Sequence, residues 1–341
     1  MIIKTAHDIQ TNLDFIIRSG VGLLREGMRK ARKFDPDNPF ENYGEKNEYF
    51  NNANNTCQFS LWKLRLYDLC ERYYAILLRE IREYEENHDT NFNKGMVYAN
   101  LGVSQLAQGK IDEGFANILK ANIEDEPYHR ADPTKTVFKS PLYIQFEEVT
   151  EGFILRHSDL YRKEESAPID KAFLDTLLSS LDTDSHVLFI SVVEKIRRTL
   201  EVLKDKDNRF TRLQIFLCLQ DLCLSIENTL KKKNSLTGML KALLDSLFSS
   251  ASGRLRLPWK PVFDNNYRFT SSNNATQFES NLRRILAIGD NTARRLLICC
   301  AVRNFSSHNL DVGNDYVFKN IELIFDNILS SIFFLHDSGC I

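Results

Sequence analysis

The chain has 341 residues, of which 43 % are hydrophobic and 26 % are charged, a composition typical of globular proteins and unlike that of disordered or collagen-like chains. It contains only 14 Gly and 8 Pro, which disfavours an all-β fold with many turns. No run of about 18 uncharged apolar residues occurs, so we expect no transmembrane helix and no membrane partner.

The net charge of −2 is unevenly distributed along the chain. Residues 209–341 contain 16 Lys and Arg against 11 Asp and Glu, a net charge of +5, which leaves −7 for residues 1–208. A polyanionic partner therefore fits the second part better than the first. An imbalance of this size is also common in proteins that bind no polyanion.

The N-terminal part reads as a series of helices. Apolar residues recur every three or four positions in residues 7–34 and 59–87, the spacing of an amphipathic helix. Residues 38–57 are rich in Asn and Gly, which predicts a loop between these two helices.

Two features predict a cytoplasmic protein. The first twenty residues lack the continuous apolar core of a signal peptide. The seven cysteines form no CxxC pair, and Cys218, Cys223, Cys299 and Cys300 lie in apolar helical patterns, which indicates buried free thiols rather than disulfides or a structural zinc site. We expect no metal and no other cofactor.

A helical hairpin is predicted near residues 94–127. Its sequence, KGMVYANLGVSQLAQGKIDEGFANILKANIEDEP, places small residues such as Gly102 and Gly114 where two helices would cross closely. The segment resembles one tetratricopeptide repeat, although Gln105 stands where an aromatic residue is usual and Pro127 comes one place late. No second copy follows, so packing is favoured over a peptide-binding array.

The polar run KDKDNR at residues 204–209 suggests a domain boundary. We therefore predict an all-α protein with an N-terminal helical region, residues 1–205, and a C-terminal helical bundle, residues 209–341. The predicted C-terminal elements are helices at 209–233, 235–250, 276–288, 291–306 and 315–336, with a loop at 251–275.

A polar stretch, RNFSSHN, interrupts two apolar helical segments at residues 303–309. The preceding ARRLLICCAV is almost wholly apolar, which predicts a helix at the centre of the bundle. Asn304 and His308 are four residues apart, as are Arg303 and Ser307, so each pair would share a face of a continuous helix. Arg303 and His308 would lie about 140° apart on such a helix, so a kink or a second subunit would have to bring them together.

A comparable pair elsewhere, Arg82 and His88, lies one residue further apart at the charged end of a helix, and we interpret it as solvated.

The stretch RNFSSH resembles the signature of HEPN domains, which is Arg, usually a polar residue, three further positions, and His. Members of that family are helical bundles that usually dimerise, and many are metal-independent ribonucleases of bacterial defence or toxin–antitoxin systems. Others have lost catalysis and serve as binding modules. The resemblance covers roughly residues 209–341 and implies RNA as the substrate and a homodimer formed through the C-terminal bundle.

Carried over to this chain, the resemblance makes Arg303, His308 and Asn304 the catalytic residues. Histidine can act as general acid or base near neutral pH, and Arg offers two aligned donors to a developing negative charge. An acidic residue from an earlier helix often supports such a site. Glu227 is our first choice and Asp221 the second, and Ser307 is a further supporting residue.

The predicted loop at 251–275 combines cations with aromatic residues, as single-stranded nucleic-acid surfaces do. Its candidate RNA-binding residues are Arg254, Arg256, Lys260 and Arg268. A loop anchored by its aromatic residues would show the same composition.

The sequence thus favours a cytoplasmic HEPN-type endoribonuclease that leaves 2′,3′-cyclic phosphates, with a protein regulator bound to the N-terminal region. The alternatives are a non-catalytic module that binds protein or RNA, and a tetratricopeptide-like adaptor whose C-terminal bundle only oligomerises.

Overall fold

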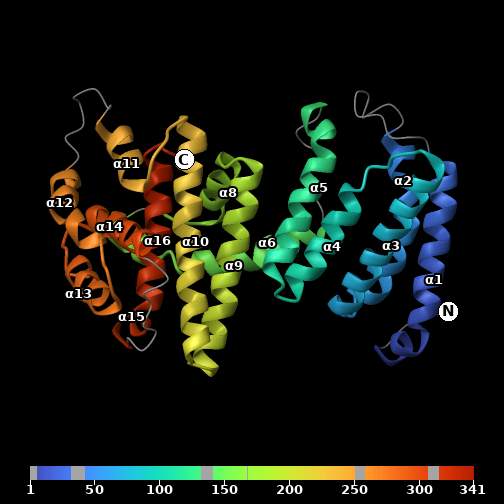
Figure 1. The fold of residues 1–341 in the computed structure, drawn as a ribbon, viewed down its shortest axis with the longest axis horizontal. Helices are drawn as coiled ribbons and strands as arrows, with labels where there is room; N and C mark the ends of the chain where they lie inside the picture. Colours follow the sequence, from blue (N-terminus) through green and yellow to red (C-terminus); the bar gives the residue numbers. More distant parts are fainter. Residues whose placement is uncertain (1–5, 32–42, 132–140, 167, 250–257, 306–314) are drawn as a thin grey trace. The chain divides into compact units, whose positions relative to one another are not determined.

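The structure is a computed structural model that describes residues 6–31, 43–131, 141–166, 168–249, 258–305 and 315–341. These residues form α-helices, one π-helical turn and one 3₁₀ turn, and they contain no β-strand (Figure 1). The predicted all-α class is therefore confirmed. No helix among the described residues is long and apolar enough to cross a membrane.

The chain divides into two compact units, Met1–Glu148 and Val149–Ile341, which we call unit 1 and unit 2. The division falls within helix α6 (Pro141–Arg156).

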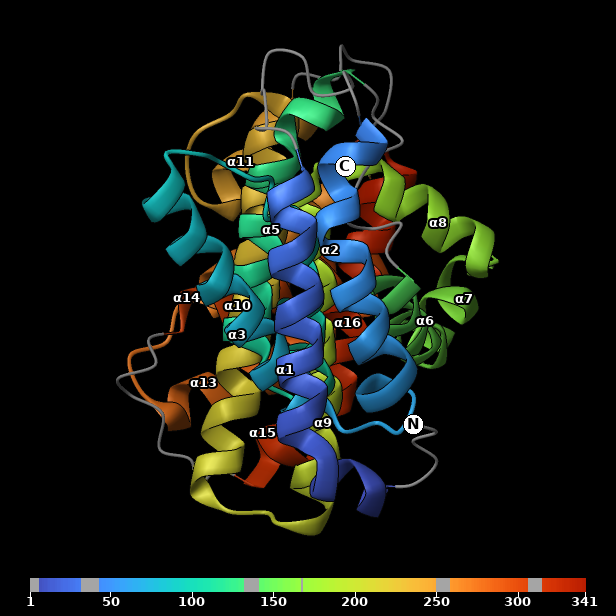
Figure 2. The ribbon, with the colours of Figure 1, turned by 90° about the vertical axis from the view of Figure 1, so that its right-hand side faces the viewer.

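Unit 1 is built from long helices that run roughly along one another (Figure 2). Its elements before α6 are α1 (Ala6–Lys30), α2 (Tyr43–Cys57), the π-helical turn η1 (Gln58–Trp62), α3 (Tyr67–His88), α4 (Gly95–Ala107) and α5 (Ile111–Ala131).

The predicted loop at residues 38–57 is wrong for the part that the structure describes, because α2 begins at Tyr43. Tyr49, Ala53 and Cys57 are buried at helical spacing. The hydroxyl of Tyr73 donates to the carbonyl oxygen of Ala53 at 2.6 Å, so α3 holds this face. Tertiary packing outweighs the poor helix propensity of the many Asn residues in α2.

Helices α4 and α5 pack as a hairpin with a close crossing. A Cβ atom added at Gly102 would lie 2.8 Å from the carbonyl oxygen of Gly114, so the two backbones approach too closely for larger residues. Gln105, at the position where the repeat usually has an aromatic residue, is bonded instead. Its side chain donates to Glu71 at 3.1 Å and accepts from Asn117 at 2.8 Å. The likeness to a tetratricopeptide repeat remains a resemblance of sequence.

Unit 2 contains the C-terminal half of α6 and all later elements. These are α7 (Asp159–Glu165), α8 (Lys171–Ser180), α9 (Thr183–Asp205), α10 (Arg209–Asn234), α11 (Leu240–Ser249), α12 (Trp259–Asn266), the 3₁₀ turn η3 (Tyr267–Thr270), α13 (Ala275–Leu286), α14 (Asn291–Asn304), α15 (Asp315–Lys319) and α16 (Ile321–Asp337).

The boundary predicted at residues 205–209 lies inside unit 2. It separates α9 from α10, yet these two helices pack side by side in the unit (Figure 1). Lys232 near the end of α10 pairs with Asp182 and Asp184 at the start of α9, at 3.0 and 3.4 Å. The polar run is therefore the turn of a helical hairpin.

Helix α14 lies at the centre of unit 2, as its apolar sequence predicts. Every residue from Arg295 to Val302 is buried. The helix packs against α10, α12, α13 and α16. Its last turn carries Arg303, so the packing of the core fixes where this side chain begins.

Two glycines of α1 should respond oppositely to substitution by alanine. A Cβ at Gly27 would lie 2.5 Å from the Cα atom of Tyr49, whereas a Cβ at Gly22 would meet nothing within 4 Å. We expect Gly27→Ala to lower the free energy of unfolding by about 1–3 kcal/mol through overpacking. The control, Gly22→Ala, should raise it by about 0.5–1 kcal/mol, because alanine favours the helix. Urea unfolding followed by circular dichroism measures both, and equal effects would contradict the α1–α2 packing.

Asp125 should make unit 1 less stable as pH rises. It lies half-buried beside Asn93, whose Nδ2 donates to its Oδ1 at 3.0 Å. Burial raises the pKa of this carboxyl from 3.8 to about 6, so the folded state keeps the proton to a higher pH than the unfolded chain does. The free energy of unfolding therefore falls between these two pH values.

We expect Asp125→Asn to remove this dependence. The variant should exceed the wild type in unfolding free energy by roughly 1–3 kcal/mol well above the raised pKa, and match it near the ordinary pKa of aspartate. Urea unfolding of both proteins at the two ends of this range provides the comparison. A difference that does not change with pH would show that Asp125 is not protonated in the folded state.

Candidate active site

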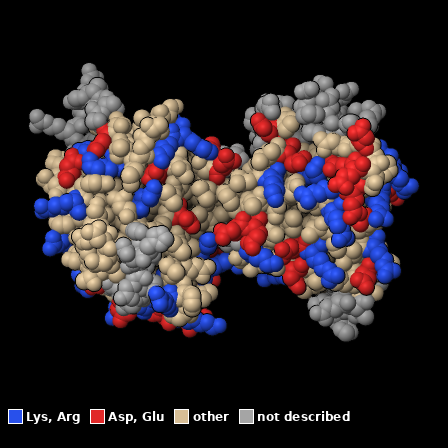
Figure 3. All heavy atoms as spheres, in the orientation of Figure 1, with Lys and Arg blue, Asp and Glu red and all other residues tan. Residues whose placement is uncertain are grey.

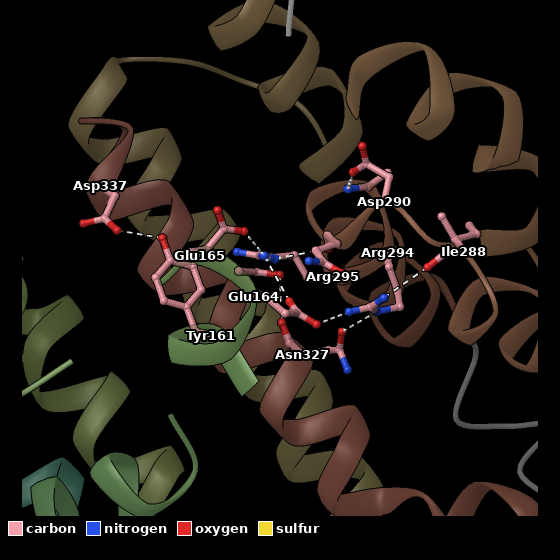
Figure 4. Close-up of polar contacts among 12 residues, drawn as sticks. Tyr161, Glu164, Glu165, Ile288, Asp290, Arg294, Arg295, Asn327 and Asp337 are labelled. Carbon is pink, nitrogen blue, oxygen red and sulfur yellow. Dashed lines mark hydrogen bonds and ion pairs between the residues drawn. The ribbon is translucent and has the colours of Figure 1, made fainter. Parts of the chain in front are cut away.

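Helix α14 positions the first half of the RNFSSHN stretch. Its N-terminus is capped by Asp290, whose Oδ1 accepts from the backbone N–H of Ala293 at 2.8 Å. In its first turns, Arg294 and Arg295 bind the carboxylates of α7 (Figure 4). Arg294 bonds Glu164 and also donates to the carbonyl oxygen of Ile288 at 3.1 Å.

Arg295 is completely buried and depends on α7 for its partners. Its Nη2 lies 3.1 Å from Glu164 Oε2 and also bonds Glu165, and its guanidinium lies 4.9 Å from the ring centre of Tyr161. Tyr161 in turn donates to Asp337 of α16 at 2.6 Å (Figure 4). These contacts tie α14 to α7 and α16.

Arg303 lies at the other end of α14 and is partly exposed, with 28 % of its side chain accessible. Its Nε donates to Oε2 of Glu227 on α10 at 3.1 Å. The other oxygen of that carboxylate, Oε1, accepts from Lys231 at 2.6 Å. Glu227 is 2 % exposed, so one buried carboxylate holds two cations.

The terminal nitrogens of Arg303 remain open. Among the described residues, neither Nη1 nor Nη2 makes a hydrogen bond, because Glu227 is bound through Nε alone. A guanidinium held in this way keeps two donors for an oxyanion. With Lys231 beside it, the local charge is positive.

Asn304 is the last residue of α14, and its amide is fixed by the 3₁₀ turn η3. Its Nδ2 donates to Thr270 Oγ1 at 3.2 Å and to the Tyr267 hydroxyl at 3.4 Å. Both amide protons are thus used within the protein, and Oδ1, which accepts from no described residue, is the atom that could accept from a ligand or a ring nitrogen.

The helix ends before the histidine. Phe305 follows α14 with extended backbone angles, φ −70° and ψ 120°. The 140° separation of Arg303 and His308 on a continuous helix therefore does not apply, and no kink within a helix is needed. His308 and Ser307 lie outside the described residues, so their roles stay predictions.

Phe305 anchors the chain where it leaves α14. Its ring is buried and stacks on Phe278 of α13 with centres 4.2 Å apart. Its carbonyl oxygen accepts from Gln220 of α10 at 2.6 Å. Phe305 is thus held in place by two neighbouring helices.

The cysteines near this site are inert thiols. All seven cysteines are free and buried, as the sequence predicts. Burial, assisted by the thiol of Cys299, raises the pKa of Cys223 well above its ordinary value, and burial also raises the pKa of Cys300. Protonated thiols are poor nucleophiles and poor metal ligands.

The predicted loop at 251–275 is wrong where the structure describes it, because α12 and η3 occupy residues 259–270. Of its candidate cations, Lys260 is neutralised by Asp245 and Asp264, each at 2.7 Å. Arg268 is exposed and lies 4.9 Å from the ring centre of Phe269. Arg254 and Arg256 lie outside the described residues.

Sequence reasoning missed several residues that shape this site. The contact of Lys231 with Glu227 could be predicted from the sequence, because Lys231 follows Glu227 by one helical turn. Tyr267, Thr270 and Gln220 reach the end of α14 across 34 to 85 residues of chain. No local pattern signals such long-range contacts.

One face of the molecule shows no large region of a single charge among the described residues (Figure 3). On the face drawn in Figure 3, Lys and Arg alternate with Asp and Glu over both units, apart from the grey atoms. No group of three or more His, Cys, Asp or Glu that could hold a metal ion occurs among the described residues. No family model, no curated protein and no solved structure matches the chain.

The buried Glu227 should contribute more stability than a more accessible glutamate in the same unit, Glu279. We expect Glu227→Ala to lower the free energy of unfolding by about 1–3 kcal/mol, because two cations lose their partner. The matched control is Glu279→Ala, which removes a surface pair with Arg283, side chains 25 % and 53 % exposed, and should cost under about 1 kcal/mol. Denaturant unfolding of both variants tests this, and equal losses would refute the bridging role of Glu227.

Proposed function

We propose that unit 2 carries an HEPN-type endoribonuclease site that acts without a metal ion. The proposal starts from the likeness of RNFSSH to the HEPN signature. The observation that supports it most is the geometry of Arg303, which Glu227 holds through Nε while neither terminal nitrogen bonds any residue in the described part of the chain.

The proposed reaction is an attack of the RNA 2′-oxygen on the adjacent phosphorus. His308 removes the proton of the 2′-hydroxyl, the bond between O2′ and phosphorus forms, and the bond to the 5′-oxygen breaks. A general acid returns a proton to the departing 5′-oxygen. The products are a 2′,3′-cyclic phosphate and a free 5′-hydroxyl, and DNA is resistant because it lacks the 2′-hydroxyl.

Arg303 and Asn304 have distinct roles in this scheme. Arg303 binds the nonbridging phosphoryl oxygens and stabilises the charge that grows on them. Asn304 uses its free Oδ1 to accept from the ring N–H of His308, which sets the tautomer, while η3 holds its amide nitrogen. Ser307 is a supporting residue that follows directly before the histidine.

The assembly and context are part of the proposal. A homodimer formed through the C-terminal bundle would place a second His308 near the same phosphate, which supplies the general acid. Unit 1 would bind a regulator, such as the antitoxin of a bacterial toxin–antitoxin or defence system. The protein would act in the cytoplasm.

The decisive test is RNA cleavage in excess EDTA. We expect wild-type protein to cut single-stranded RNA and leave cyclic phosphate ends, and His308→Ala and Arg303→Ala to be slower by a factor of about 10² or more. His88→Ala is the matched control, because this exposed histidine stacks on Tyr84 in unit 1, at 3.9 Å between ring centres, and should leave the rate unchanged.

Equal cleavage by wild type and His308→Ala would refute the proposed mechanism. Binding of RNA without cleavage would favour the non-catalytic module, and absence of both would favour the adaptor.

A further inference from the structure

An exposed pair of arginines lies beside the proposed site. Arg268 of η3 and Arg284 of α13 approach the same aromatic ring, that of Phe269, at 4.9 and 5.0 Å from its centre. Both arginines are exposed and the ring is half-buried. Within the part of the chain that the structure describes, neither guanidinium forms an ion pair or hydrogen bond.

Several other cations of unit 2 differ in this respect. Their charges are met by carboxylates: Arg212 by Asp207 and Asp315, Lys232 by Asp182 and Asp184, Lys260 by Asp245 and Asp264, and Arg283 by Glu279. Two guanidiniums that share one ring and have no carboxylate repel each other, and an anionic ligand would relieve this repulsion.

The position of the pair relates it to Asn304. The amide of Asn304 bonds Tyr267 and Thr270, and Arg268 and Phe269 are the two residues between them. The backbone that follows is also held, because Asn281 of α13 donates to the carbonyl oxygen of Ser271 at 3.0 Å. The arginine pair is therefore fixed against the end of α14.

The cation–π contacts prepare the two side chains for binding. An arginine free in solvent loses rotamer entropy when it engages a ligand. Here the ring of Phe269 already restricts both guanidiniums, so less entropy is lost on binding. The chemistry that suits two restrained, unpaired guanidiniums is a pair of phosphate groups.

We propose that Arg268 and Arg284, oriented by Phe269, form a subsite for the backbone phosphates of single-stranded RNA next to the phosphate that Arg303 binds. The choice of RNA rests on the proposed function. With this subsite, the protein contacts more than one phosphate of the RNA strand. The subsite also sets the direction in which the strand passes over η3.

The test is binding of a short fluorescein-labelled single-stranded RNA, measured by anisotropy on proteins that all carry His308→Ala, so that the RNA stays intact. We expect the double variant Arg268→Gln/Arg284→Gln to bind about tenfold more weakly or worse. The slope of log K against log salt should become shallower by about 1.4, for two lost phosphate contacts. Circular dichroism melting checks that the variant is folded.

The matched control is Arg212→Gln/Arg283→Gln, which removes from unit 2 two positive charges that are already paired with carboxylates. It should keep the affinity and the salt slope of the parent. If both double variants bind RNA equally weakly, the loss of positive charge alone explains the effect, and the subsite is overturned. Failure of the parent protein to bind RNA would also overturn it.

Failure of this inference is distinguishable from failure of the proposed function. If RNA binding depends on Arg268 and Arg284 but wild-type protein cuts no RNA, the subsite stands and the ribonuclease proposal falls. If wild-type protein cuts RNA and the Arg268→Gln/Arg284→Gln variant cuts it with an unchanged KM, the ribonuclease stands and the subsite falls.

Discussion

The burial of Arg295 constrains the architecture of unit 2. A guanidinium that is removed completely from water needs carboxylate partners, and these partners are Glu164 and Glu165 of α7. Burial raises the pKa of Glu164, while Arg294 and Arg295 act to lower it. Helix α7 must therefore pack on α14, and with it the segment before residue 205 joins the C-terminal helices. A bundle limited to residues 209–341 would leave Arg295 buried without its counter-ions.

Helix α14 also connects the core of unit 2 to the candidate site. Because α14 is tied to α7 and α16 at its first turns, and Phe305 is stacked at its other end, neither end is free to shift alone. Arg303 and Asn304 thus start from a backbone set by the core, while Glu227 and η3 fix their side chains. A site of this kind needs little rearrangement to receive a phosphate, which is the condition for effective electrostatic stabilisation.

The spacing of apolar residues predicts those helices whose formation depends on local sequence. The apolar run ARRLLICCAV indicated a central helix, and the structure buries it. The Asn-rich residues 38–57 predict a loop, whereas α2 begins at Tyr43 and is held by tertiary contacts such as that of Tyr73 with Ala53. Glu227 was singled out as an acid on an earlier helix, but spacing could not show that it meets Arg303, 76 residues away. Tyr267 and Thr270 gave no signal at all, since their contact with Asn304 arises from packing.

Two arginines of one helix, Arg295 and Arg303, differ in how their guanidiniums are surrounded. Arg295 is fully buried, and Glu164 and Glu165 meet its charge through Nη2, while its Nη1 has no hydrogen-bond partner among the described residues. Arg303 is held by Glu227 through a single nitrogen at the rim of the core, and its remaining donors point to no described residue. The two differ in what surrounds them rather than in sequence. A partly exposed arginine that the core orients and that keeps free donors among the described residues is suited to bind an anion, and Arg268 of η3 and Arg284 of α13, which have no ion pair in the described part of the chain, extend that property along the surface.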